Sequence, residues 1–308
     1  MISTMKPFRR GDVFVGATVL NNPTDDHAGQ GRIIQYDADL NERGVLWVDG
    51  TTHLIGGLTF APDGTLWAFD NLEWLVVKVG RDGRQQFVGR LVDRATGKVL
   101  FLDNGHYALT EYFKGDAQPE TLTTRYKTLP DKPGAVGTGL IFEFDAAGRL
   151  VRTHEPEVHG GVSRSMAVTH AALGSDGKTV IYTSETGTRV MRYDLAAARQ
   201  LGDLLTLPAP EPGRPPNMVF DVARTGSRVL LPLGNRIEVR GEDGAEIARW
   251  PLPGFGWALV AAGIDGGAAY VGNWFTGEVL KVSLADGVVM ARVMIAPKSL
   301  SGIVQFPG

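Results

Sequence analysis

The chain contains no cysteine, which excludes disulfide scaffolds, thiol catalysis and metal sites built on thiolates. It also lacks a basic stripe, because its 31 basic and 34 acidic residues are spread along the sequence. No apolar run approaches the length of about 18 residues that a membrane span needs, and no apolar segment follows the basic residues near the start. We therefore expect a cytoplasmic protein without a signal peptide that binds neither nucleic acid nor membrane.

Glycine and proline are abundant, at 40 and 17 residues, but they follow no three-residue period, which excludes collagen. The hydrophobic share of 43% is sufficient for a sizeable core. Long apolar stripes with a helical period are absent, so α/β folds fit poorly. Length alone suggests about two domains, but a repeat architecture often runs longer as one unit.

An internal repeat decides the architecture. Residues 54–70 read as a short apolar strand, the turn Asp63-Gly64 and a second strand of alternating residues. A third strand and a weaker fourth follow each such hairpin, and the turn glycines of the repeats are Gly64, Gly105, Gly177, Gly226 and Gly266. Four antiparallel strands in about 40–50 residues is the period of a β-propeller blade.

The two ends of the chain complement each other. Residues 301–306 resemble an innermost strand and stop where a turn should follow, whereas residues 11–19 read as a second strand without a first. We therefore predict an all-β, six-bladed β-propeller whose ring is closed by the N-terminal strands pairing with the C-terminal strand. Such closure removes open sheet edges. The prediction is one domain, 1–308.

The strands of a blade are lettered a to d from the axis outward. The a–b turns are tight, whereas the b–c loops and the d–a connections of the opposite face, the b–c face, are longer and richer in polar residues. Functional residues concentrate on such loops. The insertion 114–139 is a long b–c loop in the third blade, which we interpret as a lid; a flexible insertion is the alternative. His106 and His170 are placed at a–b turns, on the other face.

Several side chains of the b–c face suggest an active site. His53 is the candidate general acid or base, because an imidazole titrates near neutral pH. Arg164 and Arg94 are expected to bind an anionic group, with Glu111 and Glu185 orienting them or forming a structural ion-pair ring with them. The remaining candidates for substrate binding, four of them aromatic walls for a ring-shaped ligand, are Asn217, Asn273, Trp74, Trp257, Trp274 and Tyr112.

A metal site is the second chemical option. Asp25, Asp26 and His27 offer oxygen and nitrogen ligands to a divalent cation such as Ca, Mg or Zn, although no cofactor is certain. Neighbouring side chains rarely converge on one ion, and the same stretch also reads as a turn. No Gly-x-Ser-x-Gly elbow occurs, so a serine-hydrolase triad is not expected.

Residues 163–194, from Ser-Arg-Ser-Met-Ala-Val to Val-Met-Arg-Tyr-Asp, resemble a blade of the gluconolactonase/regucalcin superfamily. Strictosidine-synthase-like and NHL-repeat propellers are similar too. The resemblance implies a cation held at the axis by a Glu, two Asn and an Asp. Here those positions fall on Ile55, Ala95 or Thr96, Arg164, and Asn217, so the ligand set is not retained. An arginine beside a dication is repulsive.

Three functions remain open. The first is an enzyme acting on a small molecule in the central channel, a hydrolase of esters or lactones before a lyase or isomerase, with His53 as acid or base. The second is a non-catalytic propeller that binds a protein or ligand. The third is a metal-dependent lactonase-like enzyme that draws its ligands from Asp25, Asp26, His27 and His53. Substrate and oligomeric state are not fixed by the sequence.

Overall fold

A computed structural model describes most of the first and last thirds of the chain and parts of the middle. The described residues are 1–24, 28–51, 55–61, 63–70, 75–90, 107–109, 136–138, 141–144, 150–159, 168, 170–184, 188–208 and 219–308. Within these ranges every regular element is a β-strand. No helix long and apolar enough to cross a membrane occurs in them.

The strands form antiparallel sheets that follow one another along the chain, which makes the fold an all-β propeller. Five of the sheets have four or more strands and are complete blades, whereas six blades were predicted. The residues predicted as the a-strand of the third blade, 99–102, lie outside the described part. That blade is therefore represented by three strands only.

The chain forms two compact units, and the boundary near Val260 falls within β22. The first unit holds the described residues of 1–93 and those from Ala261 onward. Its strands form three sheets, and the third sheet contains the boundary. In spatial order within each sheet, the strands are β26 (Leu300–Gln305), β1 (Val13–Leu20), β2 (Gly29–Tyr36), β3 (Glu42–Trp47); β4 (Ile55–Phe60), β5 (Leu66–Asp70), β6 (Leu75–Val79), β7 (Gln85–Arg90); β22 (Trp257–Ala262), β23 (Ala268–Asn273), β24 (Glu278–Ser283), β25 (Val289–Met294).

The second unit holds the described residues between 102 and 260. Its remaining strands, sheet by sheet, are β8 (Tyr107–Leu109), β10 (Ile141–Phe144), β11 (Leu150–His154); β9 (Val136–Thr138), β12 (Glu157–His159); β13 (Ala171–Leu173), β14 (Thr179–Thr183), β15 (Arg189–Asp194), β16 (Arg199–Gln200), β17 (Leu205–Thr206); β18 (Ala223–Thr225), β19 (Arg228–Pro232), β20 (Arg236–Gly241), β21 (Glu246–Pro251).

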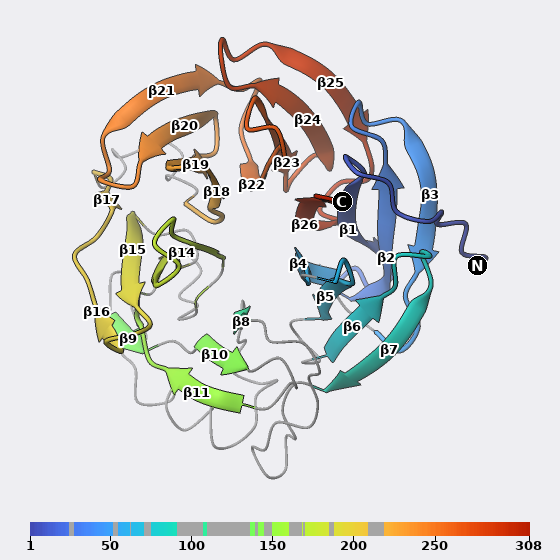
Figure 1. Ribbon diagram of the computed structural model, residues 1–308. Helices are drawn as coiled ribbons and strands as arrows, with labels where there is room; N and C mark the ends of the chain where they lie inside the picture. Colours follow the sequence, from blue (N-terminus) through green and yellow to red (C-terminus); the bar gives the residue numbers. More distant parts are fainter. Residues whose placement is uncertain are drawn as a thin grey trace. The chain divides into compact units, whose positions relative to one another are not determined.

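The predicted pairing of the chain ends is present. β26 lies beside β1 (Figure 1) and pairs with it from Val13 opposite Gln305 to Ala17 opposite Leu300. The a-strand of this blade thus comes from the C-terminal end and the b-strand from the N-terminal end. The tight a–b turns are also as predicted. Gly64, Gly177 and Gly226 have φ of 83°, 65° and 59°, which L-residues adopt at a cost.

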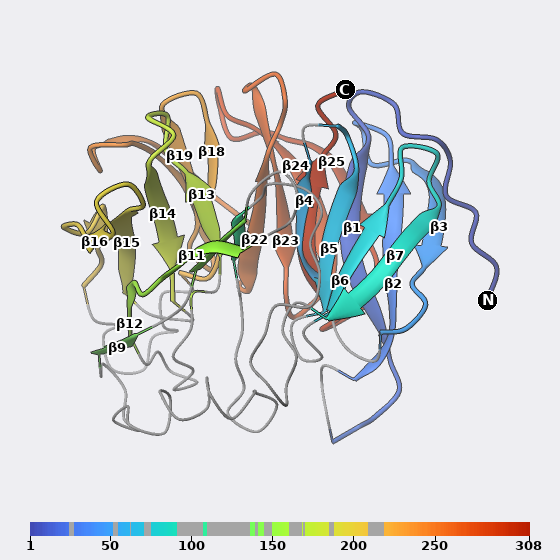
Figure 2. The same cartoon turned by 60° about the horizontal axis from the view of Figure 1, so that its bottom comes forward.

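An N-terminal strap, residues 3–8, covers the outer edge of the first blade. Thr4 and Met5 donate their backbone N–H groups to the carbonyl of Val45 in β3, at 2.7 and 3.0 Å. The chain then crosses to the next blade, where Phe8 donates its N–H to the carbonyl of Arg81 at 2.8 Å. Figure 2 shows the N-terminal segment running beside β3. A strap of this kind satisfies an edge strand that could otherwise pair with another chain.

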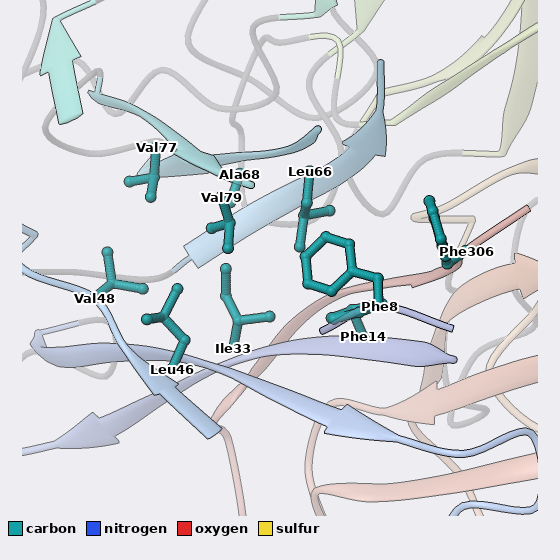
Figure 3. Packing of buried hydrophobic residues seen from close by; sticks show 10 residues of the cluster. All are labelled: Phe8, Phe14, Ile33, Leu46, Val48, Leu66, Ala68, Val77, Val79 and Phe306. Carbon is teal, nitrogen blue, oxygen red and sulfur yellow. The ribbon is translucent and has the colours of Figure 1, made fainter. Parts of the chain in front are cut away.

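Between the blade of β1 and the blade of β5, a hydrophobic cluster holds the two sheets together (Figure 3). Phe8 lies edge-on to Phe14, with ring centroids 4.6 Å apart, and to Phe306, at 5.5 Å. Aliphatic side chains fill the remainder of the interface: Ile33, Leu46, Val48, Leu66, Ala68, Val77 and Val79. The strap is therefore anchored in the core by an aromatic side chain.

Candidate functional site

Most of the predicted site lies outside the described residues. This applies to the lid 114–139 except for residues 136–138, which form β9, to His106, and to all of these candidates: His53, Arg164, Glu111, Glu185, Arg94, Asn217, Trp74, Tyr112, His27, Asp25 and Asp26. The structure describes three of the predicted residues, Trp257, Asn273 and Trp274. Among the described residues, no group of three or more His, Cys, Asp or Glu side chains is placed to hold a metal ion.

Trp257 is part of the core and is not exposed. Its side chain has 0% exposure, and its indole N–H donates to the carbonyl of Pro253 at 2.8 Å. Its backbone forms a bridge with Gly234, where a Cβ would approach the ring of Phe255 to 2.6 Å. The prediction that Trp257 forms a ligand-facing wall is therefore wrong. An indole in a strand between tightly packed segments serves packing instead.

Asn273 shapes a turn. It is 2% exposed, and its Oδ1 accepts the backbone N–H groups of Phe275 and Thr276 at 3.0 and 3.1 Å. The turn is closed by the N–H of Gly277, which donates to the carbonyl of Asn273 at 2.9 Å. A buried amide that holds two backbone donors fixes the b–c turn of its blade. Its predicted role in contacting substrate is not what these contacts indicate.

The Asn273 turn presents two aromatic residues on the b–c face. Trp274 is half-buried, and Phe275 at the tip is 46% exposed. The turn packs against the d–a connection: Lys298 donates its N–H to the carbonyl of Trp274 at 3.1 Å, and Ile295 donates to Gly277 at 2.9 Å. This face is the one on which the sequence places function, and Trp274 lies in its b–c turn directly after β23.

Gly277 makes this close approach of two loops feasible. Its φ is 75°, and a Cβ at this position would lie 1.9 Å from the carbonyl oxygen of Ala296. No side chain fits there, so the turn and the connection are held at a fixed distance. The exposed Met294, at 59%, ends β25 directly before this connection. Aromatic and methionine side chains are thus presented from a rigid support.

In the second unit, a polar cluster joins inner strands around the carbonyl of Phe220. Thr183 donates its Oγ1–H to that oxygen at 2.6 Å, and Nδ1 of His170 lies 3.0 Å from it. The ring of His170 also packs on the ring of Phe220, at 5.0 Å. His170 directly precedes β13 and is not at an a–b turn, so its predicted place on the opposite face is wrong.

Next to this cluster, Asp221 is a buried carboxyl group with backbone partners. Its Oδ1 accepts the N–H of Val222 and its Oδ2 the N–H of Val260, both at 2.7 Å. Burial raises the pKa of Asp221 to about 8, although the two donors act in the opposite direction. Asp221 lies just before β18, which begins at Ala223. In the sequence, such a buried carboxyl group is indicated by a single Asp within an apolar run, here residues 219–223.

Comparisons with known proteins support the fold. Neither a protein-family model nor a curated protein sequence matches the chain. Among solved structures, a chain of a nidogen/laminin complex is similar with a TM-score of 0.56 and 12% identity, over 96% of this chain and 98% of that one. A protein of unknown function from Bacteroides caccae is similar with a TM-score of 0.59 and 12% identity, over 97% and 100%. At such identities the similarity shows the fold alone.

Proposed function

We propose that this propeller binds a partner protein through the b–c face of the blade formed by β23, β24 and β25. The observation that supports this function best is the aromatic turn, in which Asn273 holds Trp274 and the 46% exposed Phe275 in one conformation. Rigid aromatic residues contribute much of the binding energy of protein interfaces, because little side-chain entropy is lost when they are covered. The Asn273 turn contains two aromatic residues, and its hydrogen bonds hold it in one conformation.

The chemistry around the turn indicates the kind of partner. The exposed side chains are apolar at Phe275 and Met294, and basic at Lys298. A complementary surface therefore carries apolar side chains beside a carboxylate. The similar chain from the nidogen/laminin complex is consistent with such a role for the fold but is too distant in sequence to identify the partner.

Six blades in a closed ring remain our proposal for the complete architecture. The sheet of β8, β10 and β11 has the order expected of b-, c- and d-strands. Together with the predicted a-strand at residues 99–102, it makes up a sixth blade. The β1–β26 pairing supplies the strand exchange that closure of the ring requires.

Hydrolysis of an ester or lactone with His53, Arg164, Glu111 and Glu185 stays a prediction, as do the gluconolactonase-like assignment and the small-molecule substrate. Of the predicted substrate contacts that the structure describes, Trp257 and Asn273 are engaged in packing and in a turn. Trp274 lies in the turn of the proposed interface and is half-buried. The balance of these observations favours binding over turnover.

The binding proposal is tested with three purified proteins: wild type, Phe275→Ser and Met290→Ser. Met290 is a matched control, because it is 57% exposed on β25 of the same blade but distant in sequence from the turn. Proteins captured by the wild type are identified, purified and titrated. We expect Phe275→Ser to weaken binding by about tenfold or more, as for an interface anchor, and Met290→Ser to bind like the wild type. Equal affinity of all three proteins would show that the turn is not the interface.

A further inference from the structure

In the second unit, the c- and d-strands of the blade formed by β18–β21 carry an unusual concentration of arginine. Arg236, Glu238 and Arg240 alternate along β20, so they share one face of the sheet. Arg249 lies directly opposite Glu238 on β21. One carboxylate is thus surrounded by three guanidinium groups, one on each side along its own strand and one across the ladder.

Glu238 is completely buried and organises these arginines. Its Oε1 lies 2.8 Å from Nε of Arg236 and 3.4 Å from Nε of Arg249, and its Oε2 lies 2.6 Å from Nη2 of Arg240. The arginine partners hold the pKa of Glu238 below its usual value against the effect of burial, so the group is charged. A buried anion of this kind fixes the orientation of each guanidinium plane.

The charges of the cluster do not balance. Glu246 is the second acid, and it binds Arg249 at 2.6 Å and Arg240 at 3.2 Å. Three arginines therefore face two glutamates. Arg240 is engaged by both glutamates, and it also donates from Nη1 to the carbonyl of Gly244 at 2.9 Å. The excess positive charge resides on Arg236 and Arg249.

These two arginines line a hollow on the b–c side of the blade. Its volume is about 370 Å³, and its walls are Asn235, Arg236, Arg249 and Pro251. Arg236 binds Glu238 through Nε and donates from Nη1 to Oδ1 of Asn235 at 3.2 Å. Each guanidinium carries five N–H donors. Within the described residues, both arginines therefore keep donors that no protein acceptor uses.

The spacing suits a single oxyanion. Arg249 is a diagonal neighbour of Arg236, because Arg236 is paired with Pro251 and Glu238 with Arg249. Diagonal positions across an antiparallel ladder lie about 7–8 Å apart, within reach of long side chains. We propose that Arg236 and Arg249 form a binding site for an oxyanion, a carboxylate or a phosphate group, with Asn235 at its edge. This site is separate from the Phe275 turn and does not depend on the function proposed there.

Calorimetric titration at constant ionic strength, with sodium phosphate and sodium acetate as separate probes, tests the proposal. The variant is Arg249→Gln, since Arg249 is 53% exposed and its loss leaves Glu238 two arginines. The control is Arg292→Gln, because Arg292 is also more than half exposed, at 65%, and pairs with Glu278 at 3.5 Å on another sheet. Circular dichroism confirms that each variant is folded. Arg249→Lys serves as a second variant, which keeps the positive charge but lacks the planar guanidinium group.

We expect saturable binding of at least one probe to the wild type and to Arg292→Gln. Arg249→Gln is expected to bind about tenfold or more weakly, which corresponds to one charge-assisted contact. Arg249→Lys should fall between them. The probe that binds more tightly identifies the ligand group as phosphate or carboxylate. Absence of saturable binding by either probe, or equal binding by Arg249→Gln, would overturn the proposal.

Discussion

Oδ2 of Asp221 accepts the backbone N–H of Val260 at 2.7 Å, and this contact links the segment before β18 to the inner strand β22. The other carboxyl oxygen caps Val222. Both acceptors lie in a site that excludes water, so the charged form of the group is disfavoured although its hydrogen bonds are satisfied. A sheet-to-sheet contact of the propeller is therefore coupled to the protonation of one side chain.

We predict that Asp221 makes the protein less stable as the pH rises. Its pKa is raised from 3.8 to about 8 in the folded state, so between these pH values the folded chain holds a proton that the unfolded chain has released. The stabilising contribution is complete below about pH 4 and is lost as the pH rises through about 8. The free energy of unfolding, measured in urea from pH 5 to 9, should fall by up to about 1.4 kcal/mol for each pH unit from this group.

Asp221→Asn is the matched variant for this prediction. Its amide cannot ionise, so its unfolding free energy should lack the contribution of Asp221 to the pH dependence. At pH 5 it should be about 1 kcal/mol less stable than the wild type, because the amide oxygen can serve only one of the two donors well. An identical pH profile for the two proteins would refute the coupling.

Replacing Asn273 should destabilise the protein through the turn that it caps. Asn273→Ala removes the acceptor of two backbone N–H groups, and we expect a loss of about 1–2 kcal/mol in thermal or urea unfolding. Asn22 makes a similar local contact, accepting the N–H of Thr24 at 3.0 Å, but it is exposed. Asn22→Ala should therefore change stability by less than about 0.5 kcal/mol. Equal stability of Asn273→Ala and the wild type would contradict this role.

The strap depends on a glycine in β3. A Cβ on Gly44 would lie 2.4 Å from the backbone oxygen of Thr4, which cannot give way as a flexible side chain would. We expect Gly44→Ala to displace residues 3–6, to lower stability by about 1–3 kcal/mol and to speed proteolysis of the N-terminal segment. Gly267→Ala is the control, because its added Cβ meets nothing within 4 Å. If both variants unfold like the wild type, the strap is not held in this way.

Phe8 should contribute more than any other strap residue. It is 9% exposed within the aromatic cluster, so Phe8→Ala removes contacts with Phe14 and Phe306 and leaves a cavity that costs about 3 kcal/mol or more. Ile2, just before the strap, is 86% exposed, and Ile2→Ala should be neutral within about 0.5 kcal/mol. Denaturant unfolding of the two variants provides the comparison. A small effect of Phe8→Ala would show that the strap does not contribute to the stability of the core.

The sequence predicts the blade pattern well, because turn chemistry and strand alternation are local. Gly64, Gly177 and Gly226 have the positive φ that their Asp-Gly and Thr-Gly turns suggest. The pairing of β1 with β26 also follows from the mismatch of the chain ends. Local patterns do not reveal what a polar side chain contacts, and for that reason the sequence predicts a ligand contact for Asn273, which caps a turn.

Strand limits near the axis depend on packing between blades, which local patterns do not encode. The sequence therefore predicts His170 at an a–b turn, whereas the residue directly precedes β13. Phe275 is absent from the predicted site, although the pattern Asn-Trp-Phe-Thr-Gly between two strands marks a tight turn with an exposed tip. The exposure of Phe275 depends on the neighbouring loop 295–299, and no local sequence pattern shows that these two loops lie together.

Binding of a partner protein is the function we propose for this propeller, and hydrolysis with His53 as acid or base is the competing prediction. The decisive measurement is hydrolysis of a panel of aryl esters and lactones by the wild type and by His53→Ala, with circular dichroism to verify folding. We expect that neither protein exceeds the buffer rate and that the two are indistinguishable. Turnover by the wild type that disappears in a folded His53→Ala variant would contradict this expectation and establish the enzyme that the sequence first suggested.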